Sequence, residues 1–171
     1  MIARLTRLPN PGFWLAALVA ILLDRLTKQW AVARLLPGPE IELWPGVFHL
    51  TYVENTGAAW SLFQESGGFL KWISLAVAVG LLIFALRFPL PRREQIGYGL
   101  ILAGAVGNGI DRFATGYVVD FLNVIAIQFP VFNVADVAIN LGVGLLLLQA
   151  MLTGSQSRPT PPPAETQDPP Q

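Results

Sequence analysis

Two aspartates lie in apolar surroundings where paired carboxyl groups could carry out acid–base chemistry. Asp120 lies in the segment YVVDFLNV and Asp136 in FNVADVAIN. Apolar neighbours disfavour the charged carboxylate, and two carboxyl groups that meet share one proton because they cannot both ionise easily. One can then deprotonate a water molecule while the other donates a proton to a carbonyl, as aspartyl proteolysis requires. The alternative is a structural role, such as Asp136 capping a helix, and the spacing alone leaves both interpretations open.

Further polar residues interrupt apolar segments, where an ionised side chain costs at least about 2.5–3.5 kcal/mol at the centre of a bilayer. Asp24 and Lys28 are four residues apart and share a helix face, so we expect a structural ion pair. Asn108 and Arg112 also share a face, while Asp111 points elsewhere. These positions fall at similar depths of the apolar segments, which indicates a common site. The other amide residues near it are Asn55, Asn133 and Asn140.

Cysteine and histidine contribute little to the possible chemistry. The 171 residues include no Cys and a single His, which excludes a cysteine nucleophile, a disulfide and a zinc site built from several histidines. We expect His49 to be a surface or interfacial residue rather than a ligand, without a catalytic role. The 11 basic and 11 acidic residues give a net charge of zero, which argues against a nucleic-acid partner.

The elements that must position these residues are predicted to be membrane helices. The chain is 53% hydrophobic and only 13% charged, whereas soluble domains average about 25% charged residues. A bilayer-spanning helix needs roughly 20 mostly apolar residues. The sequence therefore predicts an α-helical membrane protein with four transmembrane helices, at about residues 13–35, 69–88, 96–113 and 131–152.

The distribution of arginines predicts the orientation of these helices. Arginines cluster near the N-terminus and between the second and third apolar stretches, and Lys and Arg are enriched in cytoplasmic loops. Both termini are therefore expected in the cytoplasm, with residues 36–68 and 114–130 on the outer side. Residues 39–63 alternate like strands and predict a small extracytoplasmic β-like subdomain within the domain 1–152. The Pro-rich residues 153–171 are predicted to be a disordered cytoplasmic tail.

Five short motifs, in order along the chain, resemble those of the lipoprotein signal peptidases, the type II signal peptidases of bacteria. They are Asp24-Arg25-Leu26-Thr27-Lys28, Asn55-Thr56-Gly57-Ala58-Ala59-Trp60-Ser61, Gly107-Asn108-Gly109-Ile110-Asp111-Arg112, Val119-Asp120-Phe121 and Phe132-Asn133-Val134-Ala135-Asp136. The chain departs from the family pattern at Gly109, where a larger apolar residue is expected, and in its Pro-rich tail.

The resemblance implies an intramembrane aspartyl endopeptidase of the bacterial inner membrane, with its site toward the outer face. It would remove signal peptides from lipidated prolipoproteins by cutting before the diacylglyceryl-cysteine. Asp120 and Asp136 would be catalytic, and Asp24 and Lys28 would give structural support. No metal or organic cofactor is implied, and nothing demands more than a monomer. The residues expected to bind substrate or hold the aspartates are Asn55, Asn108, Arg112 and Asn133.

A small proton or ion transporter is the principal alternative, because it would also use membrane-embedded Asp and Arg. Transporters often contain internal repeats and broken helices near the midplane. This chain shows no repeat, and its polar residues gather toward one end of the apolar stretches.

Overall fold

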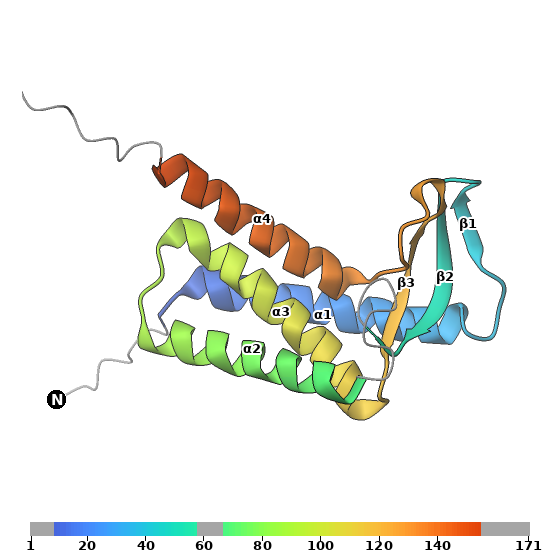
Figure 1. Ribbon diagram of the computed structural model, residues 1–171, viewed down its shortest axis with the longest axis horizontal. Coiled ribbons are helices and arrows are strands. Elements are labelled where there is room, and N and C mark those ends of the chain that lie inside the picture. Colours follow the sequence, from blue (N-terminus) through green and yellow to red (C-terminus); the bar gives the residue numbers. More distant parts are fainter. Residues whose placement is uncertain (1–8, 58–66, 155–171) are drawn as a thin grey trace, which may run out of the picture.

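The computed structural model describes residues 9–57 and 67–154, which form long helices with a small sheet at one end (Figure 1). The helices coincide with the four predicted apolar stretches to within a few residues. They are α1 (Pro11–Arg34), α2 (Gly67–Arg87), α3 (Arg92–Ala114) and α4 (Val134–Gly154). The strands are β1 (Ile41–Trp44), β2 (Phe48–Asn55) and β3 (Val118–Val124), and a short 3₁₀ helix, η3 (Ile125–Ile127), follows β3. The tail from residue 155 and the predicted β-like residues 58–63 lie outside the described residues.

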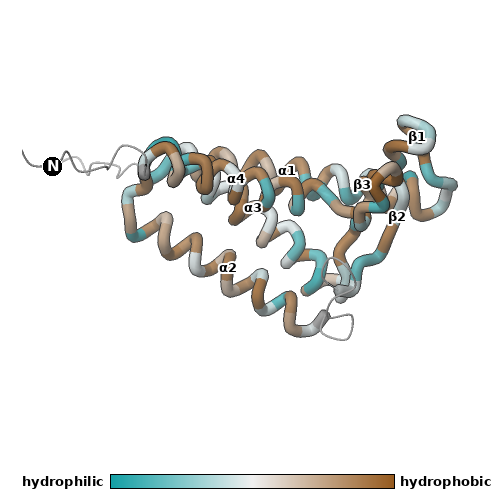
Figure 2. Tube along the Cα trace, turned by 45° about the horizontal axis from the view of Figure 1, so that its top comes forward, coloured by the Kyte–Doolittle hydropathy of each residue, from teal (hydrophilic) through white to brown (hydrophobic). Residues whose placement is uncertain are grey.

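Apolar residues predominate along the helices (Figure 2), and many of their large side chains are exposed. Leu15 on α1 is 65% exposed and Leu147 on α4 is 56% exposed. Within the described ranges, two segments are long and apolar enough to cross a membrane, Gly68–Arg87 and Val134–Thr153. The helices α1 and α3 carry more charged residues, but α1 turns Asp24 and Lys28 inward, where both are almost completely buried.

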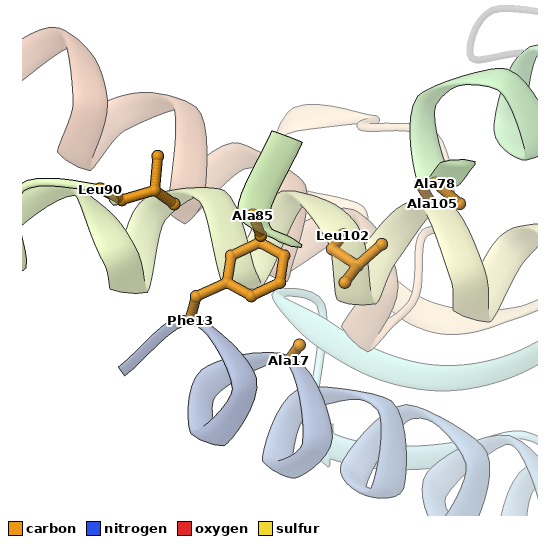
Figure 3. Packing of buried hydrophobic residues seen from close by; sticks show 7 residues of the cluster. All are labelled: Phe13, Ala17, Ala78, Ala85, Leu90, Leu102 and Ala105. Carbon is orange, nitrogen blue, oxygen red and sulfur yellow. The ribbon is translucent and has the colours of Figure 1, made fainter. Parts of the chain in front are cut away.

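Small residues let the helices pack closely around α3. A Cβ atom on Gly104 would lie 2.4 Å from the carbonyl oxygen of Ala135, so α3 and α4 can adopt this approach only because that position has no side chain. On the other side of α3, the fully buried Phe13 ring packs beside Ala85 and Leu102 (Figure 3). This close packing fixes the positions of the polar faces of α1, α3 and α4 relative to one another.

The three strands form an antiparallel sheet in the order β1-β2-β3. Residues 118–124 were expected in an outer segment without a strand, so β3 is a finding of the structure. Its first four residues are buried, and a strand covered on both faces lacks the polar–apolar alternation that marks a half-exposed strand. Pairing with β2 places Val53 opposite Asp120 and Asn55 opposite Val118. The sheet thereby carries one of the two aspartates to the ends of the helices.

The structure corrects one expectation about the sheet. His49 was predicted to be a surface or interfacial residue, but it is only 6% exposed. It lies on the central strand β2, between Glu42 on β1 and Asn123 on β3. Its cross-strand neighbours flank it and Glu40 contacts its ring, which the sequence of β2 alone does not reveal.

Candidate active site

Asp120 is buried on β3 and is held by two amide groups. Its Oδ2 accepts a hydrogen bond from Asn55 Nδ2 at 2.8 Å, and its Oδ1 accepts one from Asn133 Nδ2 at 2.5 Å. Asn55 ends β2, and Asn133 immediately precedes α4, so three elements meet at this carboxyl group. Asn55 is itself oriented by the backbone N–H of Gly57, which donates to its Oδ1 at 3.0 Å.

Asp136 lies in the first turn of α4 and takes part in a reciprocal cap. Its Oδ2 accepts the backbone N–H of Asn133 at 3.1 Å, and its own N–H donates to Asn133 Oδ1 at 3.0 Å. This is the geometry of a capping box, here made by Asn and Asp. The second oxygen, Oδ1, accepts a hydrogen bond from Asn108 Nδ2 at 2.8 Å. The side chain of Asp136 therefore caps the start of α4 and also belongs to the site.

A short chain of amides connects the two aspartates. Asn133 Nδ2 donates to Asp120 and also lies 3.1 Å from Asn108 Oδ1, while Asn108 donates to Asp136. Both aspartates line the same cavity of about 510 Å³. Burial, and to a smaller extent the negative charge of Asp136, raise the pKa of Asp120 to about 6 against the lowering effect of the hydrogen bond from Asn55. The two carboxyl groups thus interact electrostatically.

The cavity has an apolar wall that the sequence did not identify as part of the site. This wall comes from the segment between η3 and α4 and from one face of α4. A cavity of this volume with a few convergent polar groups is typical of a ligand site. Its apolar lining residues are Phe129, Pro130, Val131, Phe132, Val137 and Leu141. The fourth helix was predicted to begin at about residue 131, but α4 begins at Val134, and only the tertiary structure places residues 129–132 beside Asp120.

Arg112 and Asn140 complete the polar part of the cavity. Arg112 Nη1 lies 3.4 Å from Ser74 Oγ on α2, and its buried Nε has no hydrogen-bond partner among the described residues. Arg112 lines the cavity, and its guanidinium has further donors besides the one near Ser74. Asn140 Nδ2 donates to the Asp136 carbonyl at 2.9 Å. The Asn55 motif reaches the site through Asn55 and Gly57, while its residues 58–61 lie outside the described residues.

A buried ion network lies behind the aspartates. The predicted Asp24–Lys28 pair is present, with 3.1 Å between Oδ2 and Nζ. Lys28 Nζ also lies 2.9 Å from Asp111 Oδ2 and 2.9 Å from Asn108 Oδ1. Arg25 pairs with the other oxygen of Asp111. Asp111 was expected to point away from the face of Asn108, but both residues contact Lys28; Asp111 does not line the cavity, and its two cationic partners on α1 were not predicted.

This network is connected to both aspartates. Asp24 Oδ1 accepts the N–H of Ala135 at 3.0 Å, which anchors the first turn of α4, the turn that carries Asp136. Lys28 holds Asn108, the amide that donates to Asp136. The sequence-predicted residues of α1, α3 and α4 are thus brought together at one end of the helices, beside the sheet.

Two carboxyl groups in one cavity, linked by amides and facing an apolar wall, are the arrangement that peptidases of the aspartic class require. The family model described as signal peptidase II matches residues 16–152. A lipoprotein signal peptidase of Gloeobacter violaceus is 62% identical over 156 residues, which cover 91% of this chain and 88% of that protein. One from Synechocystis is 58% identical over 139 residues, or 81% of this chain and 86% of that protein.

A solved structure has the same fold. It is titled as a bacterial membrane enzyme determined by the in meso method at 2.3 Å resolution, with a TM-score of 0.76 and 29% identity. The match covers 86% of this chain and 92% of that one. The chain belongs to the signal peptidase II family. The comparisons do not support the alternative of a small transporter.

Proposed function

We propose that this chain removes signal peptides from lipidated bacterial prolipoproteins by cutting before the diacylglyceryl-cysteine, with Asp120 and Asp136 as its catalytic pair. The observation that carries the proposal is the chain of amides that links both carboxyl groups at one cavity. The family and the names of the relatives support the reaction.

In the proposed mechanism, the two carboxyl groups share one proton. The ionised group accepts a proton from water, whose oxygen attacks the scissile carbonyl carbon while the protonated group donates to the carbonyl oxygen. The resulting diol collapses, the C–N bond breaks, and the amine of the cysteine takes a proton from the pair. Asn55, Asn108 and Asn133 hold the carboxyl oxygens by the hydrogen bonds described above. Arg112, which lines the cavity, would bind a backbone carbonyl of the substrate with a guanidinium donor that Ser74 does not engage.

The position of the site suits a substrate that is itself embedded in a bilayer. The site lies beside the sheet, and the first residues of α1 and last residues of α4 lie at the opposite end of the helices (Figure 1). We therefore place four transmembrane helices in the inner membrane, both termini in the cytoplasm and the site toward the outer face. The lipid chains of the substrate would remain in the bilayer, and a single copy of the chain holds all of these site residues.

Cleavage of a defined precursor tests this function. We expect the purified protein in detergent to cut a diacylglyceryl-modified preprolipoprotein once, which leaves the lipidated cysteine as the new N-terminus by mass spectrometry. The same precursor without the lipid is the matched control and should be cut much more slowly. Cleavage at another bond, or equal cleavage of both precursors, would contradict the proposal.

The shared proton predicts a pH dependence. Since burial raises the pKa of Asp120 to about 6, the pair keeps its proton below that pH and loses it above. Loss of the proton removes the general acid, so kcat/KM should decline as the pH rises through about 6.

Replacement Asp136→Asn removes one of the charges that raise this pKa, so Asp120 should titrate at lower pH. Carboxyl ¹³C NMR of the substrate-free protein measures both values, and an unchanged pKa in the variant would argue against coupling.

A further inference from the structure

A second group of chemically reactive side chains lies on the sheet, outside the cavity of the aspartates. The ligand atoms of Glu40, Glu42 and His49 all lie within 4.8 Å of one another. None of the three lines the cavity that holds Asp120 and Asp136. The peptidase reaction proposed above uses none of them.

Strand pairing places two of these residues side by side. Glu42 on β1 is the antiparallel partner of His49 on β2, and directly opposite residues project from the same face of a sheet. Glu40, just before β1, reaches the same point, with Oε1 3.3 Å from His49 Nδ1. The hydroxyl of Thr51 donates to Glu40 Oε2 at 2.8 Å, and Asn123 Nδ2 donates to that hydroxyl at 3.1 Å. The backbone and these outer hydrogen bonds therefore preorganise the group.

The carboxylates of this group lack a neighbouring Lys or Arg among the described residues, and one of its ring nitrogens lacks a hydrogen-bond partner there. Among the described residues, no Lys or Arg forms an ion pair with Glu40 or Glu42. The side chain of His49 is only 7% exposed, yet its Nε2 has no hydrogen-bond partner among those residues. A buried nitrogen left without a partner costs about 1–3 kcal/mol. Two carboxylates and one imidazole thus converge with a net negative charge, with Nδ1 of the ring facing Glu40 and Nε2 left without a partner.

We propose that Glu40, Glu42 and His49 bind a divalent transition-metal ion of the Zn²⁺ type. An imidazole with carboxylates suits zinc, whereas calcium and magnesium prefer sets of oxygen ligands alone. Ligands of a tetrahedral zinc at about 2.1 Å lie roughly 3.4 Å apart. The three atoms would therefore have to close by up to about 1.4 Å, which flexible glutamate side chains at the edge of a sheet can do. Water would occupy the fourth position, and two carboxylates would neutralise the ion.

The bound ion would clip β1 to β2. The strand β1 is exposed along its whole length, and its pairing with β2 is interrupted by an irregularity between Glu42 and Trp44. Two of the ligands belong to β1 and the residue before it, and the third to β2. Because the opposite end of β2 carries Asn55, which donates to Asp120, the clip would stiffen the strand that supports the site.

Titration with Zn²⁺ alone tests the proposal on the full untagged chain in detergent. We expect calorimetry to give one ion per chain and the ion to raise the unfolding temperature, since a ligand that binds only the folded state stabilises it. Co²⁺ in place of Zn²⁺ should give the visible absorption of a tetrahedral site. Glu42 is an exposed ligand. Loss of an outer hydrogen-bond partner of a metal ligand weakens metal binding by roughly 10- to 100-fold, and Glu42→Gln, which removes a ligand itself, should weaken Zn²⁺ binding by more than that. His49→Ala should do the same if it folds.

Matched controls separate this site from other carboxylates. Glu54→Gln changes an exposed glutamate of β2, the strand that carries His49, and this variant should bind Zn²⁺ like the unaltered chain. The variant Asp120→Asn should also bind unchanged, which separates the ion from the peptidase site. Absence of saturable binding below millimolar Zn²⁺ would overturn the proposal and leave a His49–Glu40 pair only. Equal binding by the Glu42→Gln and Glu54→Gln variants would overturn it too.

Discussion

The largest effect that we expect is the loss of cleavage of the lipidated precursor in each of the variants Asp120→Asn and Asp136→Asn, while the chain stays folded. General acid–base catalysis contributes about 10²–10⁴-fold for one group, and here each carboxyl group depends on the other. An amide at either position can neither take a proton from water nor share one. We therefore expect kcat to fall by about 10⁴-fold or more in both single variants.

The variants also separate catalysis from structure. Asp136 takes part in the cap of α4 through two hydrogen bonds with Asn133. Asparagine retains an acceptor oxygen and the backbone N–H, so the cap can persist in Asp136→Asn. Unfolding temperatures measured alongside cleavage should then change little. Glu54→Gln, an exposed carboxylate outside the cavity, is the control and should cleave normally. Turnover retained by either aspartate variant would refute the catalytic pair.

Lys28→Met should cause the largest loss of stability. Lys28 is 2% exposed and lies within 3.1 Å of Asp24, Asp111 and Asn108. Removing one partner from a buried ion network leaves uncompensated charge and typically costs about 3–5 kcal/mol. Asp24 would lose its cation, whereas Asp111 would keep Arg25. Chemical unfolding in detergent, followed by circular dichroism, measures the free energy of unfolding.

The chain offers a matched control for this variant, because its only other lysine is Lys71. Lys71 Nζ lies 5.8 Å from the centroid of the Trp72 ring and 5.7 Å from that of Phe113. An exposed cation–π contact is worth about 0.5–1 kcal/mol. Lys71→Met should therefore cost at most about 1 kcal/mol. If both lysine variants unfold at the same denaturant concentration, the network does not stabilise the fold as described.

Local properties of the sequence determined the helices and one ion pair. The helices α2 and α4 are apolar runs of about 20 residues, and α1 and α3 are apolar runs interrupted by charged residues, so each can be recognised from neighbours in the chain. The Asp24–Lys28 pair follows from the same local geometry, because residues four apart share a helix face. The aspartates and amides of the site were identified by their types and by the family motifs, but their mutual positions were not. Asp120 and Asp136 are 16 residues apart, and a strand, a 3₁₀ helix and a turn lie between them.

The tertiary structure alone decided which of these residues touch. Packing of α3 against α1 and α4 brings Asn108 within reach of both Lys28 and Asp136. Pairing of β3 with β2 places Asp120 beside Asn55, a contact across 65 residues of chain. Such contacts depend on how separate elements pack, and short-range periodicity carries no information about that packing. The sequence by itself determined the bilayer-length helices and the chemical types of the site, whereas packing created the amide chain between the aspartates and the Glu40–Glu42–His49 group.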